Sequence, residues 1–278
     1  MTVAPSRINV MEYAGKDHLL NVVKAERAAF FDLIDRAEGA QWEAPTACSD
    51  WQLRDIAAHL VDVIKAYLAR FALARSGQPF PEALGLRAMA KGLDASAKAF
   101  RGVPRDELIA RLKRSSDELF QIFDALDAQQ WTGELIPHVY MGPLPTFFYP
   151  AFQLMDYSVH AWDIRQGLGR PAPLSEAAAT TLIPFMFILM QATFDVEKAG
   201  DLACSCGIQI TGPHGGNWRL NVKPDGVTFE EGSPEGCPVV LSLDPNEFVL
   251  SSFQRIRGGV ASGDPELAER FRTIFFKI

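Results

Sequence analysis

The amino-acid sequence predicts a two-domain α+β protein: a helical bundle followed by a smaller domain of strands and helices. The chain has 278 residues, which suggests roughly two domains, each large enough to bury its own core. In its first two-thirds, apolar residues recur at a spacing of three to four, which is typical of amphipathic helices. The alternation of apolar and polar residues later in the chain, broken by Gly and Pro, indicates strands.

Four long helices are expected in the first domain, which we place at residues 1–171. They are predicted over 16–36, from Ser49 to Arg75, from Pro104 to beyond Phe123, and over 147–166. Ser49 begins the second helix with Gln52 as its capping-box partner. A short helix is expected over 86–99, and a Pro- and Gly-rich loop over 133–145. Four amphipathic helices with one longer connection form a four-helix bundle.

The second domain is placed at residues 172–278, after Pro171 and Pro173. An apolar helix is expected over about 175–198, strands within 203–212, 217–232 and 237–244, and helices over 245–255 and 265–275. Strands followed by helices around one core make this a small α+β domain.

Composition excludes several classes of protein. A net charge of −7 gives no basic face for a nucleic-acid backbone. Four scattered cysteines are too few for a disulfide scaffold, and the first residues lack a signal-peptide pattern, so we expect a cytoplasmic protein. The most apolar stretch, 182–194, is shorter than a membrane span and contains Pro184. We therefore expect small-molecule partners, with neither nucleic acid nor membrane.

Two predicted helices carry polar residues on their buried faces. His59 lies among Ile56 and Leu60, while Asp156 and His160 are four residues apart and share one face. Two histidines and a carboxylate on facing helices can converge on one ion, and three ligands with an open position are typical of catalytic zinc. Alternatively, each histidine is an ordinary buried side chain with a hydrogen-bond partner. The spacing alone leaves both interpretations open.

Two segments carry motifs of a known family. Residues 42–60 contain Trp42, Pro45, Trp51, Asp55, His59 and Leu60, and residues 154–171 contain Asp156, His160, Asp163, Ile164 and Gly169. Both segments resemble the mycothiol-dependent maleylpyruvate isomerase family, whose N-terminal domains are DinB-like metal-binding bundles. The resemblance implies that His59, Asp156 and His160 bind a divalent metal, usually zinc.

The carboxylate departs from the family pattern. The family generally has Glu where this chain has Asp156, whose side chain is one methylene shorter. Either a backbone shift brings the shorter carboxylate within bonding distance of the metal, or the carboxylate hydrogen-bonds to a metal ligand and does not bind the metal itself. Asp163 is the fallback ligand, although a helix-end charge is its simpler role.

The C-terminal segment resembles a sterol-carrier-type α+β domain, which often follows the bundle in this family. The family has an Arg before the last helix that matters for activity, and Arg255 and Arg257 lie in that zone. A guanidinium grips a carboxylate through two oxygens, so either could orient an anionic substrate. The alternative is a solvated surface charge.

The resemblance implies a metal-dependent isomerase or S-transferase that uses mycothiol or another small thiol. A metal-bound thiolate would attack a small anionic electrophile. Two alternatives remain: a non-catalytic protein that holds a hydrophobic ligand in its C-terminal domain, or a metal-dependent hydrolase that needs no thiol. Outside the motif histidines, Cys48 is interpreted as structural and His138 as a solvated loop residue.

Overall fold

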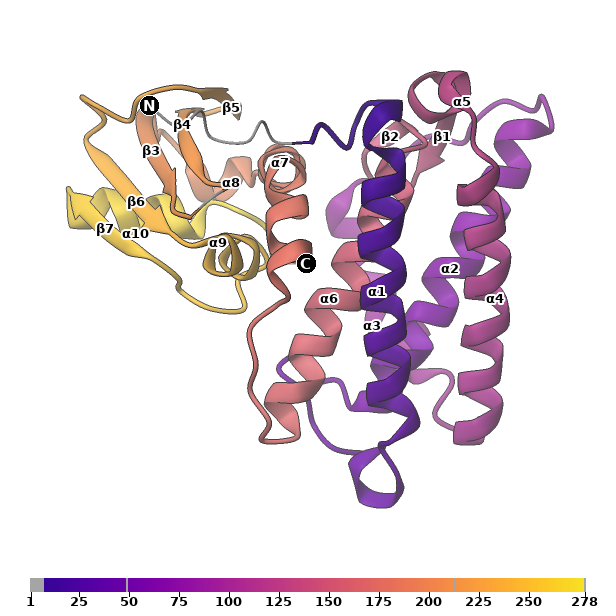
Figure 1. The fold of residues 1–278 in the computed structure, drawn as a ribbon. Coiled ribbons are helices and arrows are strands. Elements are labelled where there is room, and N and C mark those ends of the chain that lie inside the picture. The colour runs from indigo at the N-terminus through magenta and orange to yellow at the C-terminus, as the bar shows by residue number, and fades with distance from the viewer. Residues whose placement is uncertain (1–7, 49, 213, 278) are drawn as a thin grey trace. The chain divides into compact units, whose positions relative to one another are not determined.

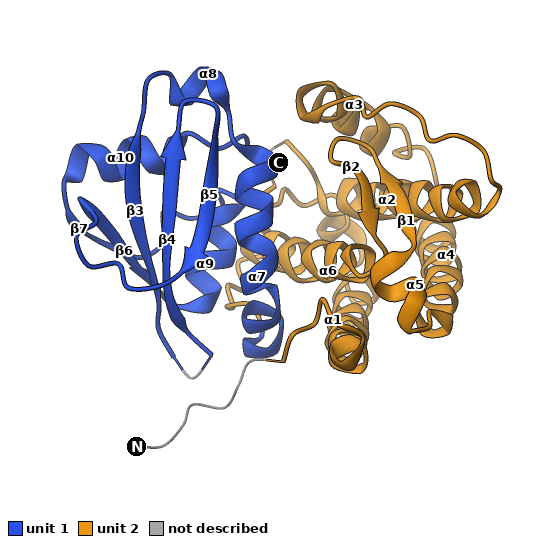
Figure 2. Cartoon of the chain, turned by 90° about the horizontal axis from the view of Figure 1, so that it is seen from above, with its two compact units in different colours: residues 1–7, 175–278 blue, residues 8–174 orange. Residues whose placement is uncertain are grey.

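The computed structural model describes residues 8–48, 50–212 and 214–277 and divides into two compact units (Figures 1 and 2). The N-terminal unit spans residues 8–174, and the C-terminal unit begins at Ser175. The expected fold class, a helical bundle followed by an α+β unit, is confirmed. The change of unit falls three residues beyond the boundary placed at residue 171.

The N-terminal unit is built on four long helices: α1 (Lys16–Asp35), α2 (Leu53–Arg75), α4 (Arg105–Ala125) and α6 (Phe148–Gly167). Shorter elements are α3 (Leu86–Lys98), α5 (Ala128–Gly133) and two single turns of 3-10 helix at Tyr13–Gly15 and Gly39–Gln41. Helix α1 packs along α6, and α2 packs along α4 (Figure 1). The apolar stripes predicted from the three-to-four spacing face this shared core.

Helix α2 begins at Leu53, so the predicted start at Ser49, which lies outside the described residues, is wrong for the helix itself. Gln52 is the N-cap, and its backbone N–H donates to the Asp55 carboxylate over 2.9 Å. The capping box therefore joins residues 52 and 55. The same carboxylate is fully buried and receives two hydrogen bonds from Arg101, at 2.9 and 2.7 Å.

The predicted loop at 133–145 is wrong. It holds an antiparallel pair of strands, β1 (Leu135–His138) and β2 (Gly142–Pro145), directly after α5. Prolines suit a two-stranded ribbon, because both strands are edges. The Tyr149 hydroxyl of α6 donates to the carbonyls of Ile136 and Pro137, at 3.2 and 3.0 Å, and fixes β1 against the bundle.

The C-terminal unit contains a five-stranded sheet in the order β5-β4-β3-β6-β7. The elements are α7 (Glu176–Thr193), α8 (Val196–Ala199), β3 (Cys204–Ile210), β4 (Gly216–Lys223), β5 (Gly226–Glu231), β6 (Val239–Leu243), α9 (Pro245–Ser252), β7 (Val260–Gly263) and α10 (Pro265–Thr273). Strands β3 and β6 pair in parallel, and the other pairs are antiparallel. Strand β7 was not predicted, because its four exposed residues carry no apolar alternation.

Helix α7 supplies much of the core of this unit. By length and composition alone it could cross a membrane, with a mean hydropathy of 1.2, yet 56% of that segment is buried inside the protein. The Phe187 ring lies 5.0 Å from the Trp218 ring of β4 and 4.9 Å from the Phe248 ring of α9. The apolar composition of α7 is therefore explained by packing against the sheet and α9.

The segment before α2 packs closely against the end of α6. A Cβ on Gly167 would lie 1.9 Å from the Pro45 carbonyl oxygen. Nearby, the backbone N–H of Ala47 donates to the Asp163 carbonyl over 3.1 Å. Only glycine permits this approach, which holds the segment of the first sequence motif beside the second motif.

Replacement of Gly167 by Ala is expected to lower the free energy of unfolding by about 1–3 kcal/mol, because the new methyl group overlaps the Pro45 carbonyl. Gly92→Ala in α3 is the matched control, since nothing lies within 4 Å of the added Cβ. That change should be neutral or slightly stabilising through helix propensity. Thermal unfolding of both variants tests this, and equal midpoints for Gly167→Ala and wild type would contradict it.

Candidate metal centre

His59, Asp156 and His160 converge in the bundle, as their positions on the two helices suggested. One potential ligand atom from each lies within 4.8 Å of the other two. The His59 and His160 rings are 5.3 Å apart and nearly perpendicular, at 82°. Helix α2 supplies the first histidine, and one face of α6 supplies the other two residues. The structure therefore gathers two nitrogen donors and one oxygen donor at one point.

The orientation of His160 is set by Asp163. Its Nδ1 lies 3.0 Å from Asp163 Oδ2, and the Asp163 carboxylate is fully buried. A carboxylate that accepts a hydrogen bond from Nδ1–H leaves Nε2 with a free lone pair, the arrangement common to metal-bound histidines. The simpler role expected for Asp163, a helix-end surface charge, is therefore wrong. Cys48 also lies within 4.8 Å of this pair.

His59 has a buried nitrogen without a partner. Its Nδ1 makes no hydrogen bond within the described part of the chain. Burial, and to a smaller extent the neighbouring His160, lowers the pKa of His59 to about 3. The imidazole is therefore neutral, which is the form that binds metals. A bound cation would relieve the unfavourable burial in this part of the site.

Asp156 is perturbed in the opposite direction. Burial raises its pKa to about 6, although His160 and a hydrogen bond from Gln153 act against the rise. The Gln153 amide donates to Asp156 Oδ2 over 3.1 Å. A buried carboxylate is costly unless a cation balances it. The short Asp side chain still brings an oxygen within 4.8 Å of both imidazoles, so this donor set fits a divalent metal such as zinc.

His138 is buried on β1, so its interpretation as a solvated loop residue is wrong. It is 7% exposed, and its Nδ1 has no partner in the described residues. The ring lies 4.9 Å from the Phe152 ring and 4.6 Å from the Tyr140 ring. Burial, with Arg70 nearby, lowers the pKa of His138 to about 3. No sequence pattern indicated this burial, because the hairpin that causes it was not predicted.

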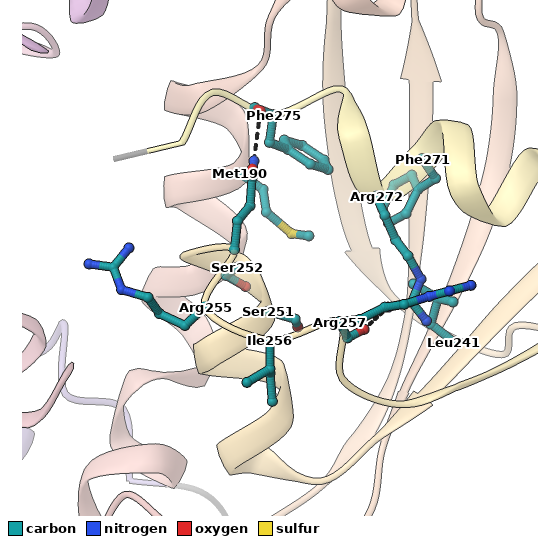
Figure 3. A pocket seen from close by; sticks show the side chains of 11 residues that line it. Met190, Leu241, Ser251, Ser252, Arg255, Ile256, Arg257, Phe271, Arg272 and Phe275 are labelled. Carbon is teal, nitrogen blue, oxygen red and sulfur yellow. Dashed lines mark hydrogen bonds between the residues drawn. The ribbon is translucent and has the colours of Figure 1, made fainter. Parts of the chain in front are cut away.

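Arg255 and Arg257 belong to the C-terminal unit, where they line a pocket of about 330 Å³ (Figure 3). Arg257 is largely exposed and pairs with Glu269 at 2.5 Å, whereas Arg255 donates to the Phe253 carbonyl over 3.2 Å. Figure 3 shows Arg257 beside Arg272, while Arg255 points the other way.

Sequence reasoning missed Arg272, which lines the same pocket. One of its nitrogens donates to the Gly258 carbonyl over 2.7 Å, and its buried Nε has no hydrogen-bond partner in the described residues. Gln254, at the rim, adopts a left-handed backbone with φ of 53°. Such a conformation favours Gly.

Comparisons with known proteins agree with the motifs. The family profile described as "Mycothiol maleylpyruvate isomerase N-terminal domain" matches residues 23–165. A solved structure of a mycothiol-dependent maleylpyruvate isomerase is 15% identical, with a TM-score of 0.60 over 89% of this chain and 92% of the other. A histidine-to-alanine mutant of such an isomerase is 14% identical, with a TM-score of 0.61 over 89% of this chain and 92% of the other. At these identities the similarity shows a common fold. No curated protein matches the chain.

Replacement of Asp163 by Asn should weaken zinc binding about 10- to 100-fold, because the candidate ligand His160 loses the carboxylate that orients it and raises its basicity. A competition titration with a chromophoric chelator measures this. The matched control is Asp117→Asn on α4, whose carboxylate is mostly exposed. Equal zinc affinities for Asp163→Asn and wild type would contradict the role given to Asp163.

In the metal-free protein, Asp156 should make stability fall as pH rises from about 4 to about 6. Its folded pKa of about 6 lies above the value of about 3.9 for an unfolded chain. The folded state therefore binds more protons in this window, and the free energy of unfolding decreases with pH. The difference in stability between wild type and Asp156→Asn, measured by denaturant titration across this range, isolates the effect. A difference that does not vary with pH would contradict it.

Proposed function

The chain belongs to the mycothiol maleylpyruvate isomerase N-terminal domain family, and from this premise we propose that it is an enzyme that uses a small thiol and a divalent metal. Its substrate is a small anionic electrophile, which it isomerises or joins to the thiol. One observation carries the proposal: His59, Asp156 and His160 bring their ligand atoms within 4.8 Å of one another in the part of the chain that the profile matches.

Zinc is the metal that we propose for this site, held by His59, Asp156 and His160. When bound by three protein ligands, zinc supplies a fourth position for a thiol sulfur and favours the nucleophilic thiolate form. Asp163 would hold His160 in the tautomer that leaves Nε2 available. The buried Asp156 carboxylate would lower the net charge of the site.

Trp51 would shield one side of the site from water. Its ring lies 4.9 Å from the His59 ring and 6.2 Å from the His160 ring. The indole Nε1 donates to the Asp94 carboxylate of α3 over 3.1 Å, which fixes the ring in this position. Exclusion of water strengthens the electrostatic interactions within a site and protects a reactive thiolate.

Mycothiol is the cosubstrate that we propose, with a maleylpyruvate-like acid as the electrophile. Arg255 or Arg257 would bind a carboxylate of this substrate, because both residues line the pocket of the C-terminal unit. The described cysteines are all free, in keeping with the reduced cytoplasm where we propose that the enzyme works.

Turnover of maleylpyruvate by the full chain tests this function. We expect isomerisation only when zinc and mycothiol are both present, and at least a 100-fold loss in His160→Ala, which removes one ligand. Asp117→Asn, far from the ligands in sequence and mostly exposed, should retain wild-type activity.

The other outcomes separate the alternatives. Turnover of an ester or amide without thiol would favour a metal-dependent hydrolase. An absence of turnover across a panel of electrophiles, in a chain with zinc bound, would contradict the proposed function. Function would then be sought in the pocket of the C-terminal unit, whose apolar lining residues, Met190, Leu241, Phe271 and Phe275, could hold a hydrophobic ligand.

A further inference from the structure

Tyr67 of α2 lies on the same side of the bundle as the candidate ligands. It follows His59 by eight residues, about two turns along one helix face. Its ring is 6.4 Å from the ring of Phe152, which precedes Asp156 by one turn of α6. Side chains on a helix lean toward its N-terminus. The phenol of Tyr67 therefore extends back along α2 in the direction of His59 and Asp156.

Tyr140 reaches the same region from the turn between β1 and β2. Its ring is 4.6 Å from the His138 ring, which lies 4.9 Å from the Phe152 ring. The hairpin therefore places Tyr140 over the face of α6 that carries Asp156. In agreement with this position, burial and then the Asp156 carboxylate raise the pKa values of both Tyr67 and Tyr140. Both phenols keep their protons.

Neither hydroxyl has a hydrogen-bond partner among residues 8–48, 50–212 and 214–277. Two other tyrosines of this unit are satisfied: Tyr149 donates to backbone carbonyls, and Tyr157 is 2.9 Å from the Ser116 hydroxyl. The hydroxyl oxygens of Tyr67 and Tyr140 are not completely buried, so both remain accessible to solvent. Both hydroxyls are therefore available to donate to a bound ligand.

We propose that the hydroxyls of Tyr67 and Tyr140 form an oxyanion subsite that binds the carbonyl oxygen of the substrate. This inference rests on the proposed function, in which the carbonyl group of the substrate is conjugated to a carbon–carbon double bond, and adds the residues that would bind its oxygen. The donors come from separate elements, α2 and the β1–β2 turn, and both rings lie near Phe152: Tyr67 directly, and Tyr140 through the His138 ring. Preorganised donors aimed at developing charge stabilise a transition state strongly.

The step balances without a further reactant. The thiolate sulfur bonds to one carbon of the double bond, and the π electron pair moves onto the carbonyl oxygen as an enolate. Tyr67 and Tyr140 hydrogen-bond to this oxygen while the former double bond, now single, rotates. The electron pair then returns, the carbon–sulfur bond breaks and the thiolate leaves. No proton is gained or lost overall, so phenols that stay protonated suit this role.

Tyr67→Phe and Tyr140→Phe test the subsite, because each keeps its ring and loses only an unpaired hydroxyl. In the zinc-loaded full chain we expect kcat to fall about 100- to 1,000-fold in each variant. Zinc content and the thermal midpoint should stay at wild-type values. If the hydroxyls had only a structural role, their loss would lower the thermal midpoint or the zinc content together with kcat. Tyr157→Phe is the matched control: it removes the hydrogen bond between Tyr157 and Ser116, whose hydroxyl still accepts from Arg27, so its stability should fall while kcat is unchanged.

Binding of acetylpyruvate gives a readout that needs no turnover. The keto form of this diketo acid presents carbonyl oxygens but has no carbon–carbon double bond to isomerise. Calorimetry on the zinc-loaded chain should show a Kd about tenfold higher in Tyr67→Phe and Tyr140→Phe than in wild type and Tyr157→Phe. Weaker binding in both variants, with no turnover in wild type, would support the subsite and overturn the proposed function. No binding in wild type, or equal Kd values throughout, would overturn the subsite, even if wild type turns over maleylpyruvate.

Discussion

Burial of two imidazoles and a carboxylate by α2 and α6 is the constraint on which the N-terminal unit depends. The pKa of His59 is lowered and that of Asp156 is raised, so burial drives both groups toward their neutral forms. Contacts within the protein offset only part of the free-energy cost of burying these groups. Asp163 hydrogen-bonds to His160 and Gln153 donates to Asp156, but Nδ1 of His59 has no partner in the described residues. A cation would compensate all three groups at once.

The segment before α2 supports this arrangement from outside. The capping box of Gln52 and Asp55 begins α2 at Leu53. The Arg101 guanidinium, which follows α3 in the chain, donates to the buried Asp55 carboxylate. Trp51 links the same region to α3 through Asp94 and places its ring against His59. The close approach at Gly167 fastens the segment to α6. The residues of the two sequence motifs therefore divide into candidate ligands and the residues that hold those ligands in position.

Much of the fold could be predicted from periodicity, because long amphipathic helices and alternating strands repeat their signal many times. Helices α1, α4 and α6 match the predicted ranges closely, and the two motifs identified the residues that converge. Short elements gave no comparable signal: prolines concealed β1 and β2, and the four residues of β7 show no alternation. The start of α2 was misplaced because several polar residues near it could cap a helix.

Tertiary context determines the remaining site features. His138 and Tyr140 lie near α6 only because the hairpin folds onto it, and Asp163 contacts His160 only because that ring turns toward it. A tyrosine at helical spacing is usually a core residue, so nothing in the sequence distinguishes Tyr67 from Tyr149. Their hydrogen bonds distinguish them: the Tyr149 hydroxyl donates to carbonyls of β1, whereas the Tyr67 hydroxyl has no partner in the described residues.

The central claim is that the side chains on α2 and α6 hold a zinc ion to which a thiol binds. X-ray absorption at the zinc edge, recorded before and after addition of mycothiol, tests it most directly. The account predicts nitrogen and oxygen scatterers at about 2.0–2.2 Å, two of them imidazoles, and a new sulfur scatterer at about 2.3 Å once the thiol is present. A spectrum without imidazole scattering, or one that the thiol leaves unchanged, would contradict the account.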